Sequence, residues 1–167
     1  YGPASAPVGA RGELKELLPI PSIDFDGDEY YLDYDRKDSI GKVAGFQGTA
    51  PALLKAYSWI RRMGSKGLEE AAEMAVINNN YLMEKLLKIR GVDVSYQEDH
   101  RIQEARMSLQ KMKEDTGVGT EDVNRRIVDY GVSSYFESHH PWIVSEPFTP
   151  EPTEAAWKEE LDRWAEI

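Results

Sequence analysis

The sequence predicts an α+β domain in which helices pack on one face of a small, mainly antiparallel sheet. Two observations predict this class. Long stretches with an apolar residue at every third or fourth position indicate helices, and short segments rich in β-branched and aromatic residues lie between them. With 41% hydrophobic residues among 167, the chain can form a core, which excludes a disordered acidic tail.

The first part of the chain is predicted to hold a loop, a short helix and a hairpin. Residues 1–10 are rich in Gly and Pro, which favours a loop. Three Leu residues at helical spacing predict a short amphipathic helix over residues 11–18, which Pro19 ends. The turn Asp26-Gly27-Asp28 can then join two short extended pieces, the second around residues 30–32.

Two helices are predicted in the middle of the chain. Apolar residues from Leu53 to Met63 follow the 3.6-residue period, and Gly64-Ser-Lys-Gly67 interrupts it. A second amphipathic helix begins near Leu68 and ends at Gly91. This longer helix is expected to supply the largest apolar face of the domain.

Two strands and two further helices are predicted in the last part. Period-two or β-branched character predicts strands at residues 92–96 and 101–110. Thr120 is the expected N-cap of a helix over residues 121–130. Thr153 is the expected cap of a final helix, whose apolar face comprises Trp157, Leu161 and Trp164.

Charge and cysteine content exclude several kinds of function. With 20 Lys and Arg against 30 Asp and Glu, the net charge is -10, which repels nucleic acid and anionic lipid. No apolar run approaches the roughly 20 residues that span a bilayer, so we expect neither a nucleic-acid nor a membrane partner. The absence of Cys excludes disulfides, Cys-ligated zinc and thiol catalysis, and fits a reducing compartment.

No metal site is expected. The acidic residues Asp24, Asp26 and Asp28 could suggest calcium, but an EF-hand loop begun at Asp24 needs Gly at its sixth position, where the chain has Glu29. Its twelfth position is Asp35 instead of a bidentate Glu. A solvated acidic turn is therefore the favoured interpretation.

The only histidine cluster is His139-His140. Adjacent residues of an extended segment point to opposite sides, so a surface or domain-contact role is favoured over metal binding. A histidine that faced a cofactor cleft would be suited to proton transfer near neutral pH. Both uses remain open.

Two further polar features lie in predicted regular elements. Asn79, within Asn78-Asn-Asn80, falls on the apolar stripe of the long helix, and a buried amide bonded to neighbouring backbone is the favoured interpretation. Arg106 falls on the strand face opposite Ala105 and Met107. Its guanidinium could grip a carboxylate, although a surface salt bridge is the commoner use. None of these spacings amounts to a catalytic constellation.

Several segments resemble, in the same order and spacing, the C-terminal part of the P-protein family of the glycine cleavage system. Gly2-Pro-Ala-Ser-Ala-Pro-Val-Gly9 resembles the family's Gly-Pro-Gly-Ser-Gly-Pro-Val-Gly stretch. The resemblance is strongest to the second (β) subunit of the two-subunit prokaryotic type. The other matching segments are Tyr30-Tyr-Leu-Asp-Tyr-Asp35, Ser39-Ile-Gly-Lys-Val43, Gly48 to Arg61, Gly67-Leu-Glu-Glu, Asn78-Asn-Asn-Tyr-Leu82, Asp115-Thr-Gly-Val118, Asp129-Tyr-Gly131 and Glu151-Pro-Thr-Glu154.

The resemblance implies part of a fold-type-I enzyme that uses pyridoxal phosphate (PLP). Residues 1–35 would end the large PLP domain and connect it to a small C-terminal domain, residues 36–167. It implies cofactor contacts from Gly2, Pro3 and Ser5. The candidates for the substrate cleft are Arg106, His139 and His140.

The implied activity is that of glycine dehydrogenase (decarboxylating), an oxidoreductase of glycine catabolism. The family decarboxylates glycine and passes the aminomethyl group to the lipoyl arm of the H-protein, with PLP as electron sink. The implied partners are lipoylated H-protein and the α subunit, in a homo- or hetero-oligomer in the cytoplasm. The family's Schiff-base Lys, in a His-Lys-Thr motif, would precede Tyr1. We therefore expect a C-terminal fragment without a catalytic residue, which binds no PLP and is inactive alone.

Some positions depart from the family pattern. The family's Met-His-Glu-Phe-Val reads Ile102-Gln-Glu-Ala-Arg106, and its Tyr-Gly-Phe-His-Ala-Pro-Thr is replaced over residues 130–142. Ala4 and Ala6 stand in the Gly-rich loop, where a Cβ narrows the approach to a cofactor. A diverged, non-decarboxylating paralogue or a structural partner subunit is therefore the alternative. A free-standing interaction domain would require the resemblance to be accidental.

Overall fold

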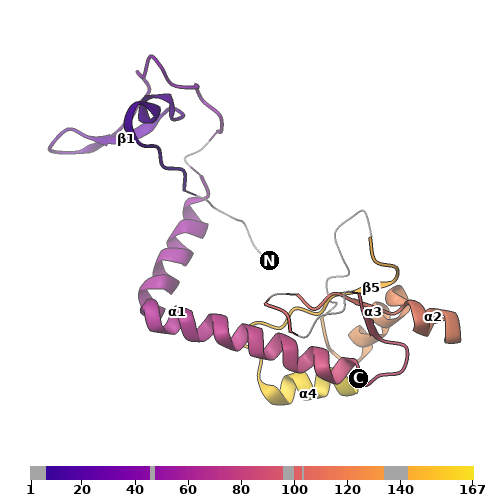
Figure 1. Ribbon diagram of the computed structural model, residues 1–167. Coiled ribbons are helices and arrows are strands. Elements are labelled where there is room, and N and C mark those ends of the chain that lie inside the picture. Colours follow the sequence, from indigo (N-terminus) through magenta and orange to yellow (C-terminus); the bar gives the residue numbers. More distant parts are fainter. Residues whose placement is uncertain (1–6, 46–47, 96–99, 103, 134–142) are drawn as a thin grey trace. The chain divides into compact units, whose positions relative to one another are not determined.

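The computed structural model describes residues 7–45, 48–95, 100–102, 104–133 and 143–167 (Figure 1). The chain divides into two compact units, residues 1–64 and residues 65–167. The described residues contain helices and two small antiparallel sheets, so the predicted α+β class is confirmed. The predicted boundary between residues 35 and 36 concerns the domains of a longer protein and stays a prediction.

The first unit contains the predicted hairpin. Strands β1 (Ser22–Phe25) and β2 (Tyr30–Asp33) pair antiparallel, with Ile23 opposite Leu32. Asp26 closes the turn, because its Oδ1 accepts from the backbone N–H of Asp28 at 2.9 Å and of Glu29 at 3.0 Å. The helix predicted over residues 11–18 is a 3-10 helix, η1 (Gly12–Leu17), without a buried residue.

Helix α1 (Ala50–Leu86) belongs to both units. Gly64 within it has φ 66° and ψ -178°, which no α-helix contains, so the predicted interruption is confirmed at that residue. Residues 65–67, also predicted to interrupt the helix, are helical. The regular helix ends at Leu86, before the predicted Gly91.

The sheet of the second unit has the order β3-β4-β5 and is antiparallel throughout. Strand β3 (Asp93–Val94) lies within the predicted 92–96, whereas the prediction of a strand over 101–110 is wrong in extent. Of the described residues in that range, only Met107–Ser108 (β4) form a strand. Ser108 Oγ then accepts from Gln110 N at 3.2 Å, where helix α2 (Gln110–Thr116) begins. Neither α2 nor β5 (Pro147–Phe148) was expected from the sequence.

The last two predicted helices are present, but their caps differ. Helix α3 (Thr120–Asp129) begins one residue early, and Gly119 rather than Thr120 is the N-cap. Helix α4 (Lys158–Glu166) begins after Trp157, so the predicted cap Thr153 instead shapes the turn before it. In both helices a carboxylate at the third helical residue, Asp122 in α3 and Glu160 in α4, accepts from the N-cap backbone N–H.

The core lies in the second unit, between α1, the sheet and α4 (Figure 1). Leu161 of α4 is buried and Trp164 partly buried, as predicted, whereas Trp157 is exposed. Among the described residues, no helix combines the length and the apolar character needed to cross a bilayer. The buried apolar side chains are Leu82, Met83, Leu86, Ala105, Met107, Leu109, Phe148 and Leu161.

Candidate functional site

A buried polar cluster lies where α1 contacts the segments before β4 and before α4. Asn78, Asn79 and Asn80 of α1 are only 6%, 4% and 9% exposed. Such amides are costly to bury unless each finds a hydrogen-bond partner. Their partners therefore determine what this cluster does.

The outer two amides bind backbone. Asn78 Nδ2 donates to the carbonyl oxygens of Thr153 at 2.9 Å and Ala156 at 3.0 Å, in the turn before α4. Asn80 Nδ2 donates to the carbonyl oxygens of Val76 at 2.8 Å and Arg101 at 2.7 Å, and its Oδ1 accepts from Arg101 N at 2.8 Å. The two side chains thus attach two separate loops to one helix.

The central amide reaches the start of β4. Asn79 Oδ1 accepts from Ala105 N at 3.3 Å. The interpretation of a buried amide bonded to neighbouring backbone is therefore confirmed. Asn79 Nδ2 is buried and has no hydrogen-bond partner among the residues that the structure describes.

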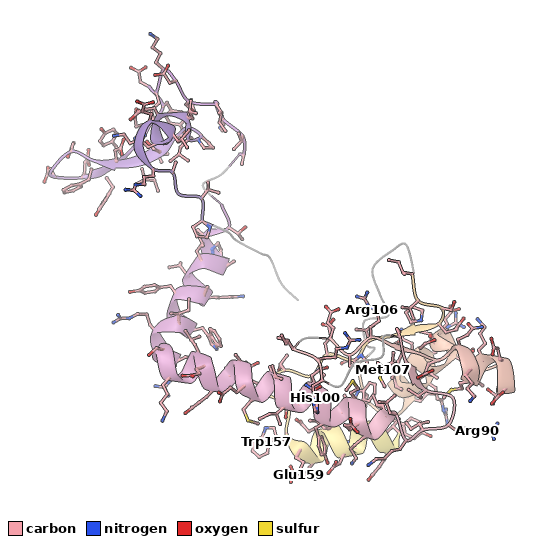
Figure 2. All side chains as sticks on the ribbon, in the orientation of Figure 1. Arg90, His100, Arg106, Met107, Trp157 and Glu159 are labelled. Atoms are coloured by element: carbon pink, nitrogen blue, oxygen red, sulfur yellow. The ribbon has the colours of Figure 1, made fainter. Side chains whose placement is uncertain are left out.

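Arg106 follows directly and points away from the core. Ala105 and Met107 are 1% and 0% exposed, whereas Arg106, beside Met107 in Figure 2, is partly exposed, so the predicted facing is confirmed. Its Nη2 lies 3.4 Å from Oε2 of Glu104, an ion pair of the kind the sequence favoured. Glu104 has φ 34°, a backbone conformation that a residue with a Cβ adopts only under strain.

Ser95, the residue after β3, lies opposite Arg106, the residue before β4. The register of β3 with β4 continues to this pair, and Ser95 N donates to Arg106 O at 3.1 Å. Directly opposite residues of an antiparallel pair share one face, with their Cβ atoms about 5 Å apart. Ser95 Oγ and Arg106 Nε are both buried and both lack a partner within the described part of the chain. These two donors could bind an anionic acceptor such as a carboxylate.

A charged cluster fixes α4 to α1 beside the asparagines. The carboxylate of Asp162 accepts from Lys158 at 2.7 Å and also from Lys85 and Tyr81 of α1. Hydrogen bonds from Lys158, Lys85 and Tyr81 hold the pKa of Asp162 well below its usual range. The hydrogen bond to Asp162 in turn raises the pKa of Lys85. The cluster is therefore charged at neutral pH, and it supports the fold.

The lysines of this chain are exposed or ion-paired. Lys85 is the only one that is not exposed, and it is paired with Asp162. A lysine that attacks a carbonyl must lose its proton, whereas ion pairing raises the pKa of Lys85, Lys113 and Lys158. The raised pKa values keep these three amino groups protonated at neutral pH.

The structure places only some of the residues singled out from the sequence. Arg106 is described, but Gly2, Pro3, Ser5, His139 and His140 lie outside the described residues, so their assignments stay predictions. Ser95 was missed, because only the register of β3 against β4 places it beside Arg106. Asp162 was missed as well, although its spacing of four from Lys158 in a helix indicated an ion pair.

Comparison with known proteins gives a consistent result. The family model described as "Glycine dehydrogenase, C-terminal domain" matches residues 71–167, more than half of the chain. The "Probable glycine dehydrogenase (decarboxylating) subunit 2" of Pyrococcus horikoshii is 43% identical over 170 residues, which cover 99% of this chain and 33% of that protein. The protein of the same name from Caldanaerobacter subterraneus is 44% identical over 169 residues, again 99% of this chain and 33% of the relative. The chain thus spans about a third of the length of these relatives.

Proposed function

Because the chain belongs to the glycine dehydrogenase family through its C-terminal domain, we propose that it forms the C-terminal part of a PLP-dependent glycine dehydrogenase (decarboxylating). The family match over residues 71–167 is the observation that carries the proposal. The relatives are named as subunit 2, which supports a second subunit as partner. Lipoylated H-protein is the proposed acceptor of the aminomethyl group, and the cytoplasm is the proposed location.

We assign the reactive lysine to a part of the protein outside this chain. All ten lysines of this chain are exposed or ion-paired, which supports that assignment. PLP, when bound, supplies an electron sink for the carbanion left by loss of carbon dioxide. Gly2, Pro3 and Ser5 are proposed to contact it from the first loop.

Arg106 is the proposed contact of this chain with a substrate carboxylate. The ion pair with Glu104 holds its guanidinium on the outer face of the sheet, and Ser95 adds a second donor beside it. A carboxylate that took the place of Glu104 would gain a bidentate partner. His139 and His140 remain proposed as further residues of the same cleft.

The activity is tested with the longer polypeptide, its partner subunit, PLP and lipoylated H-protein. Exchange of labelled bicarbonate into the carboxyl group of glycine is the expected result. Arg106→Gln should raise KM for glycine about tenfold or more, since a charge-assisted pair is lost. Arg125→Gln removes an exposed helical ion pair with Glu121 and serves as the matched control.

A diverged paralogue is the second candidate. It is favoured by the replacement of the family's Met-His-Glu-Phe-Val by Ile102-Gln-Glu-Ala-Arg106, which removes a His and adds an Arg. Absence of bicarbonate exchange, together with spectral evidence that glycine or another amino acid binds to the PLP enzyme, would favour this candidate.

A further inference from the structure

The β1–β2 hairpin has one polar face and one apolar face. Residues directly opposite each other in an antiparallel pair lie on the same face, and successive residues alternate. Asp24 and Asp33 lie on the polar face, where Arg36 binds them at 2.9 Å and 3.3 Å. The apolar face comprises Ile23, Phe25, Tyr30 and Leu32.

The polar face is internally satisfied, but the apolar face is uncovered. The four apolar side chains are 60%, 54%, 76% and 49% exposed in the order Ile23, Phe25, Tyr30 and Leu32. Phe25 and Tyr30 contact each other across the hairpin, with ring centroids 4.9 Å apart. An amphipathic sheet is expected to have its apolar face packed and its polar face in water.

The rest of the first unit does not supply a core. Pro21 is the only buried residue among those described between 7 and 64. Leu32 also borders an apolar cavity of about 540 Å³, together with Pro21, Val43 and Leu53. The apolar face and this cavity share Leu32, and we call the two together the hairpin surface. A unit of this size without a core is not expected to be stable by itself.

We propose that the hairpin surface is an interface for the remaining part of the same polypeptide, the two thirds by which the relatives exceed this chain. The relatives match 99% of this chain with only 33% of their own length, so each carries further chain to cover such a surface. A separate partner loses translational and rotational entropy when it binds, whereas a segment of the same polypeptide has lost most of it already. The apolar face itself carries no charge, as in a permanent interior rather than a transient interface.

Charge argues against a second copy of the chain as the occupant. Asp26, Asp28 and Glu29 form the tip of the hairpin beside the apolar face, and the chain has a net charge of -10. Two such hairpins facing each other would bring like charges together. The inference depends on the length of the family's proteins but not on decarboxylation of glycine.

Hydrogen exchange tests the proposal without any altered residue. Amides of residues 22–33 are compared by mass spectrometry in the 167-residue chain and in the polypeptide extended to the length of its relatives. We expect a monomeric short chain with fast exchange in the hairpin, and roughly hundredfold slower exchange in the long one. Equal, fast exchange in both would overturn the proposal.

Three other outcomes would each assign the hairpin surface to a different binding partner, and each would overturn the proposal. A protected hairpin in a dimer of the short chain assigns the surface to a second copy, and protection in its monomer assigns it to the second unit of this chain. Protection of the hairpin in the long polypeptide only after the partner subunit is added assigns the surface to that subunit.

Paired substitutions in the long polypeptide test the face. Ile23→Ser, on the apolar face, should lower Tm and speed exchange of the hairpin. Tyr31→Ser, which removes a similarly exposed side chain from the face of Asp24, should change neither. Equal effects of the two would contradict the assignment of faces. None of these readouts needs glycine, PLP or H-protein, so loss of the proposed activity would leave the result interpretable.

Discussion

The side-chain amide of Asn80 forms two hydrogen bonds with the backbone of Arg101, in the pattern by which a residue of a neighbouring strand would bind it. Its Nδ2 donates to Arg101 O at 2.7 Å and its Oδ1 accepts from Arg101 N at 2.8 Å. A helix thereby satisfies both backbone groups of a residue 21 positions away. The segment that leads to Glu104 and Arg106 is positioned through this contact.

Replacing Asn80 should be among the more destabilising single changes in the second unit. Asn80→Ala removes the side-chain partner of the N–H and C=O of Arg101 in a partly buried place, and we expect a loss of roughly 1–3 kcal/mol. Asn80→Asp keeps the acceptor but not the donors, so it separates the contribution of the accepted hydrogen bond from that of the donated ones. Urea unfolding followed by circular dichroism measures both. A loss below about 0.5 kcal/mol for Asn80→Ala, the size of an ordinary surface substitution, would contradict the role assigned to this amide.

Gly91 and Gly117 provide a matched pair of backbone tests. Their φ values are 88° and 81°, so alanine at either position is strained, by roughly 1–2 kcal/mol. At Gly91 the Cβ of alanine would also collide with Met112, whose Cα would be 2.7 Å away. At Gly117 no atom lies within 4 Å of the position of the new Cβ. Gly91→Ala should therefore lower the free energy of unfolding by about 2 kcal/mol more than Gly117→Ala. Equal losses would show that Met112 does not approach Gly91 closely.

Asp162 should make the second unit sensitive to acid. Its pKa is lowered in the folded protein, so its stabilising effect is complete above the unfolded value of about 4 and is lost as pH falls below it. Asp162→Asn should lower the urea midpoint of unfolding at pH 7. The midpoint of this variant should also decrease less than that of the unaltered protein as the pH is lowered from about 5 to about 2. Asp129→Asn, which breaks an exposed pair with Arg126, should leave the acid dependence as in the unaltered protein. The same acid dependence in Asp162→Asn would rule out this account.

Glu146 should stabilise the start of α3 through its charge. Burial raises the pKa of its carboxyl, but hydrogen bonds from Lys113 and from Thr120 N outweigh this, and the net pKa is lowered. Glu146 Oε2 accepts from Thr120 N at 2.8 Å, where a helix N-terminus favours negative charge. We expect Glu146→Gln to lower Tm more than Lys113→Met, because only the former weakens both contacts. Thermal unfolding at pH 7 measures the difference, and the reverse order would contradict the capping role.

The helices and their apolar faces could be predicted from the sequence, because the 3.6-residue period is a local property. The turn at Asp26 and the interruption at Gly64 could be located for the same reason, since a side-chain acceptor and a missing Cβ act within a few residues. Even the burial of Asn79 followed from its position on an apolar stripe.

Tertiary structure decided which distant groups meet. Ser95 and Arg106 become neighbours only through the register of β3 with β4, and Pro147 and Phe148 form a strand only because β4 offers them an open edge. Thr153, which looked like a helix cap, instead presents its carbonyl oxygen to Asn78, 75 positions earlier in the chain. Such contacts depend on the folded arrangement of the whole domain, whereas helical period and turn chemistry are encoded within a few consecutive residues.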